Sequence, residues 1–148
     1  MKAEKMFSLF AKENCIKEEK FDVFSFGCDA DALAALVSQG KKTATTSAYD
    51  LYLQENIPLP QVGAYSVVTD SRDEAVCVIR TTLVYVCAFD KVAPFHAAKE
   101  GEGSLLEWKK VHEAFFTCEL EHAGLEFHKK IPVVCEEFEV VYPKKEEL

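Results

Sequence analysis

The sequence predicts an α+β fold with a mostly antiparallel sheet in one domain of 148 residues. Apolar residues at helical spacing open the chain and recur after residue 104, whereas segments rich in Val, Ile, Thr and Tyr lie between them and near the end. This order of elements differs from the βαβ repeat of a parallel sheet. Hydrophobic residues form 49% of the chain, which excludes a disordered protein because such a core offsets the ordering entropy.

The helices and strands are expected in the following order. An amphipathic helix covers about 3–19, and the core of the domain covers about 21–142, followed by a short charged tail. Asp29 caps a second helix over 29–39, which Gly40 ends. A third helix over 104–121 opens with Ser104 and Glu107 as a capping box. Strands are expected over 62–70, 74–89 and 132–142.

Charge and composition exclude several classes of function. The net charge is −8 and only two of the 17 basic residues are arginine, so we expect no DNA partner and no tight binding of long RNA. No apolar run approaches the roughly 20 residues of a membrane span, and the N-terminus has no signal-peptide core. The six cysteines form no CxxC pair, which favours buried free thiols in a reducing compartment. We therefore expect a cytoplasmic protein without a membrane partner.

Two segments combine glycine with polar residues. The first is Gly40-Lys-Lys-Thr-Ala-Thr-Thr-Ser47, which is not a P-loop because it follows a helix and lacks the upstream glycine. It can be a ligand loop or a solvated turn that enters a strand. The second is Lys99-Glu-Gly-Glu-Gly103, where glycines permit close approach to a ligand but two solvated carboxylates explain the pattern equally well.

Together the motifs GKKTAT, EGEGSLLEW and VVCEEFEVVY resemble the ASCH domain family, and the chain is similar to its stand-alone bacterial members. The resemblance covers nearly the whole chain and implies a small PUA-like β-barrel with flanking helices. It also implies an RNA-related cleft lined by the signature GxKxxExR. Gly40 and Lys42 match this signature, whereas Thr45 replaces its Glu and Ser47 replaces its Arg.

Some small bacterial members of this family hydrolyse the acetamide of N4-acetylcytidine with a Lys, a Thr three residues later and a distant Glu. The resemblance assigns these catalytic roles to Lys42, Thr45 and Glu100, with Glu102 as the alternative to Glu100. A desolvated lysine on a loop can take the proton of a threonine, although an ion pair with Glu100 opposes that role.

Two classes of function therefore stay open: an amidohydrolase acting on an N4-acylated cytidine, and a non-catalytic RNA-binding module or ribonuclease that uses the same cleft. The expected partner is a modified nucleoside or short single-stranded RNA, and a homodimer is compatible with the sequence. No cofactor or metal is expected, since His96 and Glu100 alone are too few ligands for zinc. For Tyr49 and Trp108 the alternative is a packing role, and for Arg80 it is an exposed strand position that faces water. The candidate substrate-binding residues are Gly40, Lys41, Ser47, Tyr49, Arg80, Glu102 and Trp108.

Overall fold

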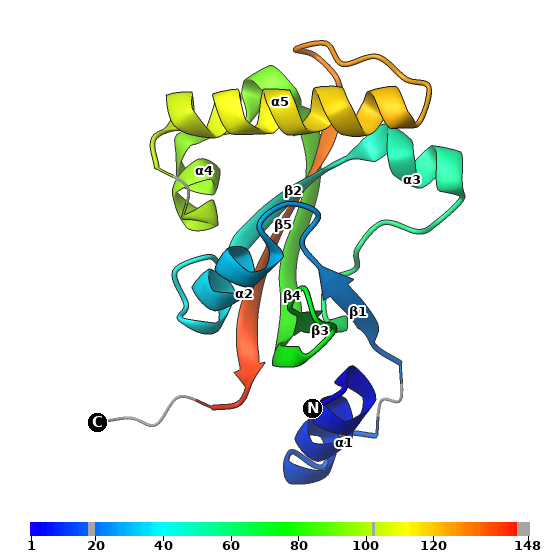
Figure 1. Ribbon diagram of the computed structural model, residues 1–148, viewed down its shortest axis with the longest axis vertical. Helices are drawn as coiled ribbons and strands as arrows, with labels where there is room; N and C mark the ends of the chain where they lie inside the picture. The colour runs from blue at the N-terminus through cyan, green and yellow to red at the C-terminus, as the bar shows by residue number, and fades with distance from the viewer. Residues whose placement is uncertain (18–19, 102, 145–148) are drawn as a thin grey trace.

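A computed structural model describes residues 1–17, 20–101 and 103–144 (Figure 1). Five strands form one sheet with the order β1-β3-β4-β5-β2, which curls into a half-barrel (Figure 1). Among the strands of the described residues, only β1 and β3 pair in parallel, so the α+β class with a mostly antiparallel sheet is confirmed. The strands are β1 (Asp22–Ser25), β2 (Ala44–Ala48), β3 (Tyr65–Thr69), β4 (Ala75–Ala88) and β5 (Pro132–Tyr142).

The three predicted strands are β3, β4 and β5, each within three residues of its expected bounds. The sequence did not separate β1 and β2 from loops, because β1 has four exposed residues and β2 is a short run of small and hydroxyl side chains. These two strands are the edges of the half-barrel. No ladder joins them within the described residues, so the sheet does not close fully.

The N-terminal helix α1 (Ala3–Glu13) is shorter than the expected 3–19. It ends because Cys15 has a φ of 54°, which a continuing helix excludes. Asp29 does not cap α2 (Ala30–Ser38), since it adopts the left-handed conformation and its side chain bonds no helix amide. Gly40, with a φ of 77°, follows the end of α2 as predicted.

The long helix α5 (Leu105–His122) begins as predicted, with the Ser104 side chain accepting a hydrogen bond from the Glu107 amide at 3.2 Å. Two helices were not predicted: α3 (Tyr49–Glu55) and α4 (Pro94–Glu100). Each has seven residues, too few to show a helical period in the sequence. A short 3-10 turn, η1 (Phe89–Lys91), precedes α4.

Helices cover both faces of the sheet. Successive side chains of β5 point to opposite faces, so the residues of this strand show which helix packs on which face. On what we call the α2 face, Phe138 packs with Phe26 and with Val37 of α2. On the opposite, α5 face, Cys135 packs with Trp108 and Phe116 of α5. A third cluster holds α1 against β3 and β4 through Phe7, Phe10, Val67 and Val78.

All six cysteines are free thiols. Cys77 and Cys135 are buried as expected, but the expectation of burial is wrong for three others, because Cys15, Cys28 and Cys118 are exposed. Among the described helices, none has the length and apolar character needed to cross a membrane.

Gly101 follows the end of α4 and packs against the loop between α2 and β2. A Cβ atom at this position would lie 2.9 Å from the carbonyl oxygen of Lys41. The same junction is fastened by a 2.7 Å hydrogen bond from the Thr43 amide to the Lys99 carbonyl. The missing side chain therefore lets α4 lie directly against the loop that carries Lys42.

We expect Gly101→Ala to lower the free energy of unfolding by at least twice as much as Gly124→Ala. Both glycines have a φ near 75°, at which an alanine costs about 1–2 kcal/mol, but a Cβ at Gly124 meets nothing within 4 Å. Urea denaturation of both variants measures the difference. Equal losses would show that the loop and α4 are not closely packed.

Candidate functional site

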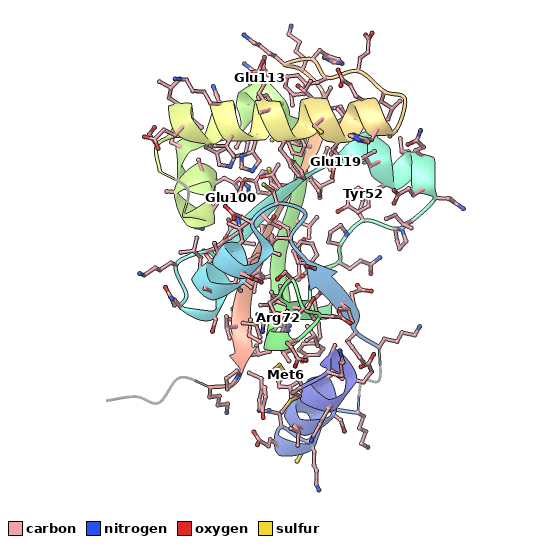
Figure 2. The ribbon with its side chains drawn as sticks, in the orientation of Figure 1. Met6, Tyr52, Arg72, Glu100, Glu113 and Glu119 are labelled. Carbon is pink, nitrogen blue, oxygen red and sulfur yellow. The ribbon has the colours of Figure 1, made fainter. Side chains whose placement is uncertain are left out.

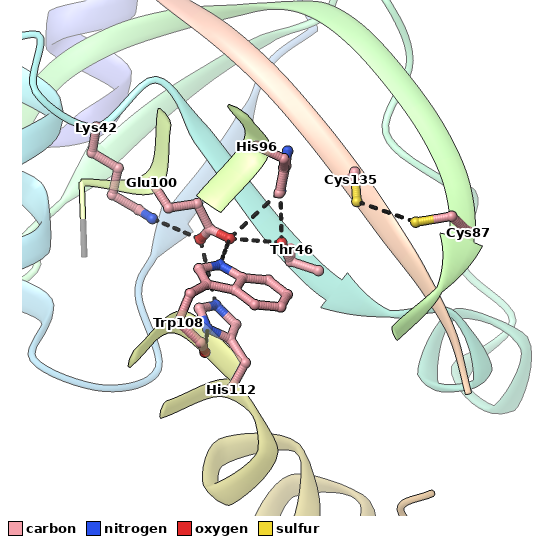
Figure 3. A network of polar contacts seen from close by, with 8 residues as sticks. All are labelled: Lys42, Thr46, Cys87, His96, Glu100, Trp108, His112 and Cys135. Atoms are coloured by element: carbon pink, nitrogen blue, oxygen red, sulfur yellow. Dashed lines mark hydrogen bonds and ion pairs between the residues drawn. The ribbon is translucent and has the colours of Figure 1, made fainter. Parts of the chain in front are cut away.

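The candidate site is centred on the carboxylate of Glu100, at the last position of α4. His96 lies one turn earlier on the same face of this helix, and the two side chains point toward the α5 face of the sheet (Figure 3). Glu100 is 1% exposed and His96 is 0% exposed. A charged group this deeply buried is costly unless other groups satisfy it.

Donors from three other parts of the chain reach this carboxylate (Figure 3). The Lys42 ammonium group donates to Oε1 at 2.9 Å, and the Thr46 hydroxyl donates to Oε2 at 2.7 Å. From α5, the indole N–H of Trp108 donates to Oε2, and Nε2 of His112 lies 3.5 Å from Oε1. We call these residues, with His96, the Glu100 network.

Hydrogen-bond chemistry fixes the direction of the bonds at Thr46. Its hydroxyl proton goes to Glu100, so the Thr46 oxygen accepts from Nε2 of His96 at 2.8 Å. His96 therefore carries its proton on Nε2, and its buried Nδ1 has no hydrogen-bond partner among the described residues. Nδ1 of His112 donates to the carbonyl of Trp108 at 2.9 Å.

The network keeps Glu100 ionised. Burial alone would raise the pKa of its carboxyl group, but the imidazole nitrogens of His112 and His96, each 3.5 Å away, and the charge of Lys42 outweigh burial and hold the pKa well below its usual range. The Glu100 carboxylate is consequently a poor proton acceptor. It can fix the position and charge of its neighbours.

Lys42 lies just before β2, an edge strand, and its side chain touches both faces of the sheet. Its ammonium group contacts Glu100 on the α5 face and lies 5.5 Å from the ring centroid of Phe26, which packs on the α2 face. Lys42 is 2% exposed, so its side chain is closely packed and desolvated although it lies on a loop.

Thr45, the predicted catalytic threonine, does not contact Glu100. Successive side chains along a strand point to opposite faces, so Thr46 faces the Glu100 network and Thr45 faces the α2 face. Thr45 lies opposite Glu136 in the β2–β5 ladder. Its hydroxyl has no hydrogen bond to the described residues, and the side chain is half-buried. Lys42 and Glu100 are in contact, whereas Thr45, which was expected to join them, lies on the other face of the sheet.

A second polar group lies on the α2 face around Thr45. The Thr81 hydroxyl donates to Oε2 of Glu136 at 2.7 Å, and Ser47 and Tyr52 share a hydrogen bond of 2.8 Å. Burial raises the pKa of Glu136, and the charge of Asp22 adds to this effect while the hydrogen bond from Thr81 opposes it. Unlike Glu100, Glu136 is partly exposed.

The other predicted residues are distributed around these two groups. Trp108 joins the Glu100 network, whereas Arg80 lies 3.8 Å from Glu139 and is partly exposed. Gly40 and Lys41 are exposed on the loop before Lys42, and Tyr49 is half-buried at the start of α3. Glu102 lies outside the described residues. A pocket of about 400 Å³ is lined by Gly40, Lys42, Thr43, Phe138, Glu139, Val140, Pro143 and Lys144.

Comparison with protein families decides the identity of the fold. The model of the ASCH domain matches residues 22–142. The chain belongs to the ASCH domain family. No curated protein matches it by sequence.

Solved ASCH structures agree with this assignment. An ASCH domain from Lactobacillus crispatus JV V101 is 33% identical, with a TM-score of 0.87 over 93% of this chain and 92% of the other. A protein from Enterococcus faecalis V583 is also 33% identical at a TM-score of 0.87, covering 93% and 86%. The ASCH protein of Zymomonas mobilis is 12% identical at a TM-score of 0.53, over 83% and 71%, and shares the fold alone.

Three residues of the Glu100 network were not among the predicted site residues: Thr46, His96 and His112. His96 and Glu100 have the i, i+4 spacing of one helix face, and Trp108 and His112 repeat it on α5, so this spacing is the signal that could have found the histidines. The network holds no metal-binding cluster: in the described ranges, no three His, Cys, Asp or Glu side chains are arranged to hold an ion.

The stability of the ASCH domain should depend on the ionisation of Glu100. Because its pKa is lower in the folded chain, its contribution is complete above the ordinary value of 4.5 and is lost as the pH falls toward the lowered value. We expect Glu100→Gln to lower the free energy of unfolding at pH 7 by about 3 kcal/mol or more, and to lose less than the wild type on acidification to pH ~3.5.

The control is Glu113→Gln, which changes an exposed glutamate on α5 and should leave the pH dependence unchanged (Figure 2). Urea unfolding at several pH values measures all three proteins. A Glu100→Gln variant with the wild-type pH dependence would contradict the lowered pKa.

Proposed function

We propose that this ASCH protein hydrolyses the amide of an acylated nucleoside of the N4-acylated cytidine type, with Thr45 as the nucleophile and Lys42 as the cation beside it. The observation that carries the proposal is the buried ion pair between Lys42 and Glu100, because it fixes a positive charge at the start of the strand that carries Thr45. Family membership and the match of Lys42, Thr45 and Glu100 to the hydrolytic members support it.

Of the two neighbouring threonines, Thr45 has the hydroxyl group that is more available to act as the nucleophile. The Thr46 hydroxyl already donates to Glu100 and accepts from His96, and its side chain is 7% exposed. A substrate would have to displace these buried bonds. Thr45 is partly exposed and its hydroxyl is not engaged by any described side chain, so its oxygen is available to attack a carbonyl carbon.

Lys42 suits the role of a fixed charge better than that of a base. The Lys42 ammonium group donates to the Glu100 carboxylate at 2.9 Å, and removing either charge would leave the other one buried without compensation. A protonated Lys42 can stabilise the negative charge that develops on the amide oxygen in the transition state. Such preorganised charge is worth most in a site from which water is excluded.

A small ligand suits this region of the molecule. The pocket of about 400 Å³ beside Lys42 falls in the range of small-molecule sites. Its lining includes Phe138 and Val140 of the α2 face, the face on which Thr45 lies, but not Thr45 itself. The net charge of −8 disfavours a long polyanion but not a neutral nucleoside.

The test is the release of acetate from N4-acetylcytidine and a panel of acylated nucleosides. We expect Thr45→Ala to abolish turnover, and Thr45→Ser to retain most of it because serine keeps the hydroxyl. Lys42→Met should lower kcat/KM by about 10²-fold or more, as expected for loss of a group that stabilises the oxyanion. Lys110→Ala, which removes an exposed lysine from α5, is the control and should match the wild type.

Circular dichroism identifies variants that lose activity through unfolding, which matters for Lys42 because its removal leaves Glu100 unpaired. Activity that survives in Thr45→Ala but not in folded Thr46→Val would assign the nucleophile to Thr46. A wild-type protein that binds short single-stranded RNA through Lys42 without turnover would instead be a binding module.

A further inference from the structure

Glu136 is the ionisable side chain that the β-sheet places beside Thr45. The two residues are direct partners in the antiparallel pairing of β2 with β5. Side chains at such positions lie on the same face with Cβ atoms about 4.5–5.5 Å apart. Both are partly exposed on the α2 face, whereas every member of the Glu100 network is buried on the other face.

Within the described residues, only one carboxylate oxygen of Glu136 takes part in a hydrogen bond. Oε2 accepts the hydrogen bond from Thr81, a residue that is 2% exposed and fixed in β4. Oε1 has no hydrogen bond to the described residues. Glu136 is therefore held by one oxygen and has the other available for a proton.

The two carboxyl groups of the site have opposite properties. Glu100 is held in its ionised form by several donors, which makes it a weak base. Burial raises the pKa of Glu136 and makes its carboxylate the stronger base of the two. When their environments make the pKa values of two carboxyl groups differ in this way, one group can supply a fixed charge and the other can exchange protons.

We propose that Glu136 is the proton acceptor for Thr45 in the amide hydrolysis, an inference that rests on the proposed function. As the Thr45 oxygen bonds to the acyl carbon, its proton passes to Oε1 of Glu136. Glu136 then gives this proton to the leaving nitrogen as the C–N bond breaks, which leaves an ester on Thr45.

Water completes the cycle. Glu136 takes a proton from the water that attacks the ester, and this proton returns to the Thr45 oxygen as the acid is released. One amide and one water are consumed, and one amine and one carboxylic acid are formed. Hydrogen bonds of this kind often tighten only when substrate is bound, so the unbonded Oε1 is consistent with the role.

The decisive variant is Glu136→Gln, which keeps the shape of the side chain and removes the base. We expect kcat/KM for N4-acetylcytidine to fall by about 10²-fold or more. The matched control is Glu137→Gln, since Glu137 is the next residue on β5, faces the opposite side and pairs with Lys99 at 2.9 Å. This control should stay within about threefold of the wild type, a range expected of a group outside the reaction.

The pH profile distinguishes a base from a structural residue. In the wild type, kcat/KM should rise with pH as Glu136 loses its proton. Thr81→Val removes a hydrogen bond that lowers the pKa of Glu136, so this rise should move to higher pH. Asp22→Asn removes an exposed charge that raises the pKa of Glu136, so in this variant the rise of kcat/KM should move to lower pH.

The other ionisable groups near Glu136 are Tyr52 and, beyond it, Glu119 of α5 (Figure 2). Burial raises the pKa of Tyr52, and both glutamates add to that effect, so the tyrosine stays neutral across the acidic range. Burial raises the pKa of the Glu119 carboxyl as well. Thr81 and Asp22 act on the pKa of Glu136 and not on that of Glu119, so a profile that moves in both variants assigns the acidic limb to Glu136. Because Asp22 is exposed, its variant is expected to fold even where Glu136→Gln does not.

Each outcome bears on a different claim. Hydrolysis by the wild type with full activity in Glu136→Gln, or with an unmoved pH profile in Asp22→Asn, would overturn the role of Glu136 and leave the proposed function standing. A folded wild type that releases no acetate from any acylated nucleoside would overturn both.

Discussion

The buried negative charge of Glu100 is the constraint on which the site depends. The carboxylate is 1% exposed, so every polar atom around it must be a donor. Its partners come from the loop before β2, from β2 itself, from α4 and from α5, which ties the edge strand to both helices. Gly101 makes the arrangement possible, since only a residue without a side chain lets α4 end against the carbonyl of Lys41.

Strand alternation then divides the chemistry between two faces. Lys42 reaches both faces because it precedes an edge strand, whereas Thr45 and Thr46 are adjacent in sequence but lie on opposite sides of the sheet. The α5 face holds a sealed network that fixes charge. The α2 face holds partly exposed hydroxyl groups and Glu136. In the reaction that we propose, the buried pair provides a fixed charge, and the proton transfers occur on the opposite face.

Much of this fold could be predicted from the sequence. The long strands β4 and β5 and the helix α5 carry clear periodic patterns, and the motifs around Lys42 and Glu100 indicate the family. The short α3 and α4 could not be predicted, since seven residues give no period, and β1 has no buried face. The site was harder to predict. The spacing from Lys42 to Thr45 is a number of residues along the chain, and it does not show on which face of the sheet each threonine lies. Glu136 was missed because only the register of β2 against β5 brings it beside Thr45.

The most direct test of the central claim is to trap the covalent intermediate. Wild-type protein is mixed with N4-acetylcytidine, quenched with acid during turnover and digested, and peptide mass spectrometry locates any added acetyl group. We expect one acetyl ester on Thr45, with more of it when hydrolysis of the ester is slowed. An acetyl group on Thr46, or turnover in which no acetylated threonine forms under any quench condition, would contradict it.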